Sequence, residues 1–185
     1  NFKSDRAPVR VVISAENLVI GYDSPLTKKI DIKIERNKKI AIRGVNGLGK
    51  STLLKTLLKL IPPIEGEREH DQFINVGYFE QEEVTSDKTA LQEFWDEFPS
   101  LTNAEARAAL AKCGLTTEHI TSQMKVLSGG ENAKVRLCKI MQRPCNILVL
   151  DEPTNHLDID AKAELTRAVK EFRGTAILVS HESEF

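Results

Sequence analysis

The sequence has 185 residues, of which 41% are hydrophobic and 29% are charged, and its net charge is −1. This composition is that of an ordinary globular domain, and it excludes disordered, collagen-like and disulfide-scaffold chains. The near balance of charges gives no overall attraction to nucleic acid or anionic lipid, and no apolar stretch approaches the ~20 residues that a membrane span requires.

The first half of the chain predicts strands followed by a helix. Residues 1–8 have the composition of a linker, and alternating apolar residues between Arg10 and Ile34 predict a small antiparallel sheet with one solvated face. The short apolar run 40–42 leads through a Gly-rich turn into an apolar-periodic stretch over 50–61, which predicts strand, loop and helix. Pro62 and Pro63 are expected to end this helix.

The second half predicts a helical insertion and then an alternation of helices and strands. Residues 74–81 are strand-like, and residues 86–126 change to helical spacing, which predicts a separate helical subdomain. Helices are expected over 130–142 and about 160–172, and strands over 147–150 and 175–180. The two strands are continuous apolar runs, typical of a parallel sheet covered on both faces. The predicted fold class is therefore α/β.

The segment from Gly44 to Ser51 matches the pattern G-x-x-x-x-G-K-[ST] and lies between a predicted strand and a predicted helix. Glycines allow backbone N–H groups to wrap around phosphates, and a helix N-terminus adds partial positive charge. Lys50 supplies a charge for the β- and γ-phosphates, and Ser51 supplies a hydroxyl ligand for Mg²⁺. The alternative is an ordinary Gly-rich turn with a solvated lysine, which the strand–loop–helix context disfavours.

Two carboxylates follow the apolar run 147–150. Asp151 is expected at the carboxyl edge of a parallel sheet, where ligands bind in open α/β folds. There it would hold Mg²⁺, and Glu152 would orient and polarise the attacking water of phosphoryl transfer. Taken alone, two acidic residues at a strand end are more simply a surface feature, but a phosphate loop earlier in the chain favours the chemical reading.

The segment 127–131, Leu-Ser-Gly-Gly-Glu, opens the helix that follows it. Ser128 and Glu131 stand in the register of a capping box, which is a purely structural explanation for both. It leaves two consecutive glycines in the first turn unexplained, because glycine weakens a helix and exposes its N–H groups. We therefore predict a second phosphate-facing surface at Ser128, Gly129 and Gly130.

With the weaker candidates Tyr22, Gln81 and His181, this ordered set resembles the nucleotide-binding domain of an ABC-type ATPase. The resemblance covers residues 9–185 and implies a P-loop NTPase, RecA-like core with an antiparallel β subdomain and a small helical subdomain at about 86–126. Residues 151–158 resemble the F subfamily, whose members are soluble, carry two such domains and act at the ribosome as translation factors or in antibiotic resistance.

The resemblance also implies roles for single residues. Glu152 would be the general base, Gln81 would approach Mg²⁺ and the attacking water, and His181 would contact the γ-phosphate. Tyr22 would stack on adenine, and Ser51, Gln81 and Asp151 would hold Mg²⁺. Ser128, Gly129 and Gly130 would cap ATP bound to a partner domain. The residues implied in cradling the triphosphate are Gly44, Asn46, Gly47, Gly49, Lys50, Ser51 and Thr52.

Several expectations concern the protein as a whole. Only 31 positions separate Lys50 from Gln81, which leaves no room for a long helical arm and implies the second of two domains. Four residues follow His181, so a C-terminal part is expected to be absent. The implied partners are a second ABC domain and, through regions outside this chain, the ribosome. Three cysteines without CxxC spacing suit reduced thiols in the cytoplasm. In relatives, the residue after the segment 127–131 is often charged or Gln, whereas this chain has Asn132.

Three other classes of protein share part of this pattern. The main alternative is the ATP-hydrolysing subunit of a membrane transporter, which residues 155–158 and the short helical region disfavour. A DNA-repair or chromosome-organising ATPase would need a long coiled coil between the motifs, and 101 positions from Lys50 to Asp151 leave no space for one. A binding module without turnover is disfavoured by the joint presence of Lys50, Glu152 and His181.

Overall fold

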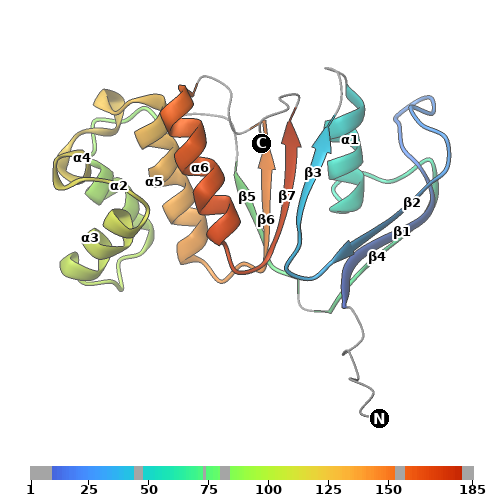
Figure 1. Ribbon diagram of the computed structural model, residues 1–185, viewed down its shortest axis with the longest axis horizontal. Coiled ribbons are helices and arrows are strands. Elements are labelled where there is room, and N and C mark those ends of the chain that lie inside the picture. The colour runs from blue at the N-terminus through green and yellow to red at the C-terminus, as the bar shows by residue number, and fades with distance from the viewer. Residues whose placement is uncertain (1–9, 44–47, 73, 80–83, 153–156, 181–185) are drawn as a thin grey trace, which may run out of the picture.

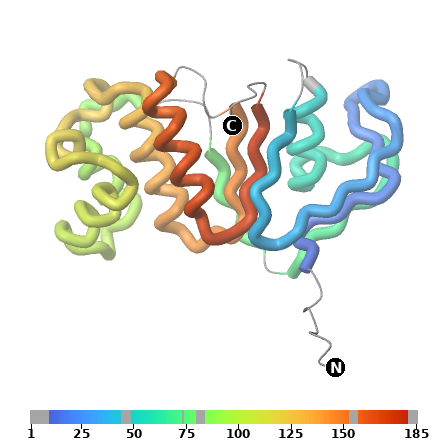
Figure 2. The backbone as a smooth tube through the Cα atoms, in the orientation of Figure 1, coloured from blue at the N-terminus to red at the C-terminus, as the bar shows by residue number. Residues whose placement is uncertain are grey.

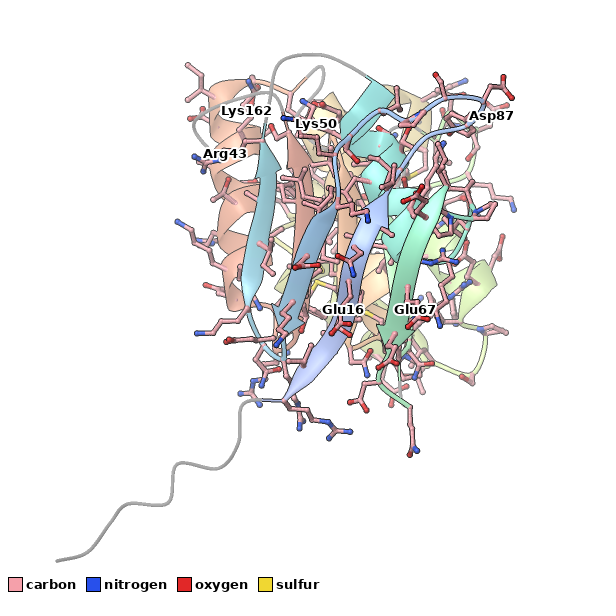
Figure 3. The ribbon with its side chains drawn as sticks, turned by 90° about the vertical axis from the view of Figure 1, so that its right-hand side faces the viewer. Glu16, Arg43, Lys50, Glu67, Asp87 and Lys162 are labelled. Atoms are coloured by element: carbon pink, nitrogen blue, oxygen red, sulfur yellow. The ribbon has the colours of Figure 1, made fainter. Side chains whose placement is uncertain are left out.

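A three-stranded antiparallel sheet forms one end of the molecule. In the computed structural model, which describes residues 10–43, 48–72, 74–79, 84–152 and 157–180, β1 (Val11–Val19) pairs with β2 (Ile30–Glu35) and β4 (Glu65–His70) in the order β2-β1-β4. The inner face of β1 is apolar, whereas Glu16 and Glu67 face each other on the outer, solvated side (Figure 3). The predicted antiparallel sheet with one wet face is confirmed by this pairing.

A four-stranded parallel sheet forms the centre. Its strands are β3 (Lys39–Arg43), β7 (Thr175–Ser180), β6 (Ile147–Asp151) and β5 (Val76–Phe79), in that spatial order. Alternate residues of β6 and β7 face opposite sides, so both sides are covered, as the unbroken apolar runs predict.

Helices cover the two faces of the parallel sheet (Figure 1). Helix α1 (Leu48–Leu57) packs with β1, β2 and the odd-numbered residues of β6 and β7, which joins the two sheets in one apolar core. Helices α5 (Gly129–Gln142) and α6 (Ile159–Glu171) pack on the other face against Phe79, Leu148 and Leu150. The predicted α/β fold class is confirmed by this arrangement.

A small helical unit lies on the side of α5 away from the sheet (Figure 2). It contains α2 (Ala90–Glu97), α3 (Asn103–Lys112), α4 (Thr117–Thr121) and the short 3-10 helix η1 (Met124–Val126). Phe94, Leu110 and Met124 are fully buried in its core, and Val135 and Cys138 of α5 complete that core. Helix α5 therefore packs in both the helical unit and the central core, and it connects them.

The end of helix α1 and the presence of strand β4 differ from the sequence prediction. Helix α1 ends at Leu57 rather than at Ile61, because Lys59 adopts a left-handed conformation (φ 62°) and the N–H of Leu60 donates to the carbonyl of Lys55. This is a Schellman-type end, which stops the helix before Pro62 can act. Strand β4 was not predicted, because its sequence EGEREH contains no apolar alternation and its pairing with β1 cannot be read from the sequence.

Candidate functional site

The carboxyl ends of three parallel strands meet at one edge of the central sheet. Arg43 at the end of β3 pairs with Ser180 of β7, and Asp151 at the end of β6 pairs with Val179 of the same strand. The first turn of α1 lies at this end of the molecule (Figure 1). Arg43, Lys50 and Lys162 are also found at this end (Figure 3), which gives the edge three cations near the start of two helices.

An ion pair joins α1 to the end of β6. The Lys50 ammonium lies 3.7 Å from Oε1 of Glu152, and the two side chains are only 10% and 14% exposed. The structure thus brings together the lysine of the phosphate-loop motif and the second carboxylate of the strand-end pair. An ammonium held beside a helix N-terminus forms an electropositive pocket suited to an anion.

Glu152 is held in an uncommon backbone conformation. Its φ of 48° lies in the left-handed region, which residues other than glycine seldom adopt and which stores strain at functional sites. Its N–H donates to the carbonyl of Val179 (2.8 Å), so the neighbouring strand β7 fixes this turn. The backbone thereby directs the Glu152 carboxylate toward α1 instead of continuing the strand.

Asp151 carries a buried oxygen without a hydrogen-bond partner among the described residues. The hydroxyl of Tyr78 donates to Oδ2 at 3.2 Å, whereas Oδ1 is buried and unpaired. An unpaired buried carboxylate oxygen is costly, and a hard cation is the partner that such an oxygen suits. The buried oxygen of Asp151 therefore suits a Mg²⁺ ion, for which Ser51 in the first turn of α1 remains the second candidate ligand.

Helix α5 begins with a doubly bonded cap. The Ser128 side chain accepts the N–H of Glu131, and Oε2 of Glu131 accepts the N–H of Ser128 at 3.1 Å, so the capping box is present. Oε1 of Glu131 lies 2.9 Å from Nε2 of His119, whose Nδ1 accepts the N–H of Thr116. The Nε2 atom therefore carries the proton, and α4 holds the start of α5 through it.

Gly130, the second glycine at the start of α5, lies against α6. A Cβ on Gly130 would lie 2.5 Å from Cβ of Ala161 in the first turn of α6, so this glycine permits close packing of the two helices. Ser128, in contrast, is exposed. The sequence interpretation assigned both glycines to anion binding, and the helix contact is a reason for Gly130 that the sequence does not reveal.

Substituting Gly130 with alanine tests this packing. We expect Gly130→Ala to lower the free energy of unfolding by about 1–3 kcal/mol, the usual cost of an inserted methyl group in a tight contact. The additional replacement Ala161→Gly removes the opposing atom, so the double variant should recover part of the loss despite the lower helix propensity of glycine. Urea denaturation of the four proteins measures this coupling, and strict additivity would contradict it.

The remaining candidates are placed as follows. Gly49 lies with Lys50 and Ser51 at the start of α1, and Thr52 is buried in the next turn. Tyr22 is 60% exposed in the connection between β1 and β2, which lies at the same end of the molecule as the start of α1 (Figure 1). Asp158 caps α6 by accepting the N–H of Ala161 at 2.8 Å. Five candidates lie outside the described residues, namely Gly44, Asn46, Gly47, Gln81 and His181.

The two helix starts do not share one pocket. Figure 1 shows the first turns of α1 and α5 at the same end of the molecule, on opposite sides of the strands β6, β7 and β3. Sequence reasoning missed Tyr78, although its position on the strand just before Gln81 directs attention to it. What the sequence does not reveal is the contact of Tyr78 with Asp151, because that contact depends on the pairing of β5 with β6.

Comparison with solved structures identifies the fold. The protein cbiO1 of Clostridium perfringens, part of the ABC transporter complex cbiONQ, superimposes with a TM-score of 0.75 over 94% of this chain and 79% of its own, at 22% identity. At that identity the likeness shows the fold alone, and the fold is that of an ABC-type nucleotide-binding domain.

Sequence comparison gives the family. The profile of the ABC transporter family matches residues 27–155, and the chain belongs to this family as an ATP-binding domain. The uncharacterized ABC transporter ATP-binding protein YfmM of Bacillus subtilis is 56% identical over all of this chain and 36% of its own length. The ABC transporter F family member 2 of Arabidopsis thaliana is 41% identical over 95% of this chain and 27% of its own.

This chain is shorter than both relatives. The chain spans only 36% and 27% of the two relatives, so it corresponds to one part of each of them. Within the described ranges, none of the helices combines the length and the apolar character needed to cross a membrane.

Proposed function

We propose that this chain is the ATP-binding and ATP-hydrolysing domain of an ABC-F type protein that acts on the ribosome in the cytoplasm. The observation that carries the enzymatic part is the Lys50–Glu152 ion pair beside the unpaired oxygen of Asp151. These three groups provide a cation for phosphate, a carboxylate for water and a ligand for Mg²⁺ at one sheet edge.

The chain's own groups divide the chemistry among them. Lys50 binds the β- and γ-phosphates, which compete with Glu152 for its ammonium. Glu152, released in this way, accepts a proton from the attacking water at its carboxylate, with Gln81 and His181 completing the site. Mg²⁺, when bound to Asp151 and Ser51 with the nucleotide, neutralises charge on the phosphates.

A second ABC domain is the proposed partner for complete activity. The first turn of α5 lies across the central strands from Lys50, and Ser128 is exposed to an approaching molecule. An exposed helix N-terminus with glycines offers N–H groups to phosphates that this chain's own pocket does not hold. Ser128, Gly129 and Gly130 would therefore cap ATP bound to the partner domain, whose own signature would cap ATP here.

The ribosome assignment rests on the F-type likeness. The 41% identity to an F family member and the segment 151–158 support it over a transporter subunit. A translation factor and a resistance protein would share every residue of this site. Growth of a deletion strain with and without ribosome-targeting antibiotics separates these two roles.

Co-sedimentation tests the proposal. We expect the full-length protein carrying Glu152→Gln to pellet with ribosomes in the presence of ATP and Mg²⁺, and to stay in the supernatant when ADP replaces ATP. The hydrolysis-deficient variant is used because it holds the ATP-bound state. Copurification with an integral membrane protein, without nucleotide-dependent ribosome binding, would instead support the transporter alternative.

A further inference from the structure

The side chain of Asn132 holds the backbone of Val84 from both sides. Asn132 is only 2% exposed in the first turns of α5, just after the segment 127–131. Its Oδ1 accepts the N–H of Val84 at 3.2 Å, and its Nδ2 donates to the carbonyl of Val84 at 2.8 Å. One carboxamide thus satisfies both backbone groups of a residue that lies 48 positions away in the chain.

A second contact joins α5 to the last residue of β5. Arg136, one turn further along α5, donates from Nε to Oδ1 of Asn132 at 3.1 Å. Its guanidinium lies over the ring of Phe79, 4.7 Å from the ring centre, and Phe79 is the buried last residue of β5. Phe79 at the end of β5 and Val84 are therefore both in contact with α5.

The hydrogen bonds of Asn132 fix the position of Val84 more specifically than apolar packing would. A buried amide is favourable only while its donors and acceptors remain paired, so the Asn132 contact fixes Val84 in one position. Asn132 differs from the residues often found after the segment 127–131, and its hydrogen bonds to Val84 give it a structural role.

We propose that Asn132 is a positioning residue, which fastens the end of β5 and the chain at Val84 to the start of α5. The inference rests on the proposed function, in which Ser128 contacts the nucleotide bound to the partner domain. The link holds the chain at Val84 against the helix that begins at Ser128. Asn132 itself contacts neither nucleotide, and it acts through Val84 and through the helix whose first turn it shares with Ser128.

The test compares three variants of the full-length protein. Asn132→Ala removes both hydrogen bonds, and Asn132→Asp keeps the acceptor but loses the donor to the Val84 carbonyl, while its charge faces Arg136. Asn103→Ala, on an exposed turn of α3, is the matched control. We expect kcat for ATP to fall about 10-fold in both Asn132 variants with KM changed less than about 2-fold, as for other residues that orient a site.

Amide hydrogen exchange measures the link directly and independently of ATP turnover. The Val84 amide should exchange at least about 10-fold more slowly in the wild type and in Asn103→Ala than in Asn132→Ala. Unprotected exchange at Val84 in the wild type would overturn the proposal even if the alanine variant failed to fold.

The remaining outcomes also decide between the two proposals. Loss of protection at Val84 in Asn132→Ala, with kcat and KM unchanged in both Asn132 variants, would leave a structural contact and overturn the positioning role. A wild-type protein without ATP hydrolysis, but with a protected Val84 amide lost in Asn132→Ala, would overturn the proposed enzymatic function while the link itself would stand.

Discussion

Replacing Glu152 with glutamine should slow ATP hydrolysis by about 10²- to 10⁴-fold, the range expected when a general base is removed. Glutamine keeps the size and hydrogen-bonding shape of the side chain, but it cannot accept the proton of the attacking water. Its amide also cannot form the ion pair with Lys50 that the carboxylate forms at 3.7 Å. Phosphate then no longer competes with the Glu152 carboxylate for the Lys50 ammonium, so ATP affinity should be retained or should rise.

Single-turnover hydrolysis and equilibrium binding of ATP, both in the full-length protein, separate these two effects. Glu171→Gln is the matched control, because this exposed residue at the end of α6 makes the same chemical change away from the sheet edge. The control should hydrolyse ATP at the wild-type rate. Wild-type turnover in Glu152→Gln would remove Glu152 from the role of base, and a parallel loss of ATP binding would indicate a structural role instead.

The apolar patterns of the sequence were sufficient for the central sheet. The runs at 147–150 and 175–180 lack alternation, and both are buried on two faces in the structure. Strand β4 shows the limit of this reasoning, because charged side chains lie on both of its faces. Backbone pairing with β1 and hydrogen bonds from Arg68 and His70 to carbonyls at the end of α1 hold the strand in place. Gly66, at φ 94°, lies against the backbone of Asn17 where β1 bulges, a contact that no local pattern reveals.

Some contacts of the candidate site could be predicted from the sequence, and others could not. The approach of Lys50 and Glu152 could be predicted, because a phosphate-loop helix and the end of a parallel strand meet at one sheet edge. The contacts of Asp151 with Tyr78 and of Asn132 with Val84 could not, since they depend on strand order and on how α5 crosses β5. Sequence motifs therefore identified the candidate groups for nucleotide binding, and the structure identified the groups that hold them in place.

Removing the cation of the phosphate-loop motif should weaken nucleotide binding itself. We expect Lys50→Ala to reduce the affinity for ATP about 10- to 100-fold, because a hydrogen bond to a charged group contributes about 1.5–3 kcal/mol. The effect has a second source in this structure. Without Lys50, the Glu152 carboxylate loses its partner and repels the incoming phosphates in a pocket where both side chains are largely buried.

The double variant Lys50→Ala with Glu152→Gln distinguishes the two sources. If repulsion by Glu152 contributes, the double variant should bind ATP more tightly than Lys50→Ala alone, although less tightly than the wild type. Lys55→Ala, in the last turn of the same helix, is the control and should bind ATP normally. Calorimetric titration with ATP and Mg²⁺ gives the four affinities. An affinity for Lys50→Ala equal to that of the wild type would show that α1 does not receive phosphate, and the function proposed for this edge would then fail.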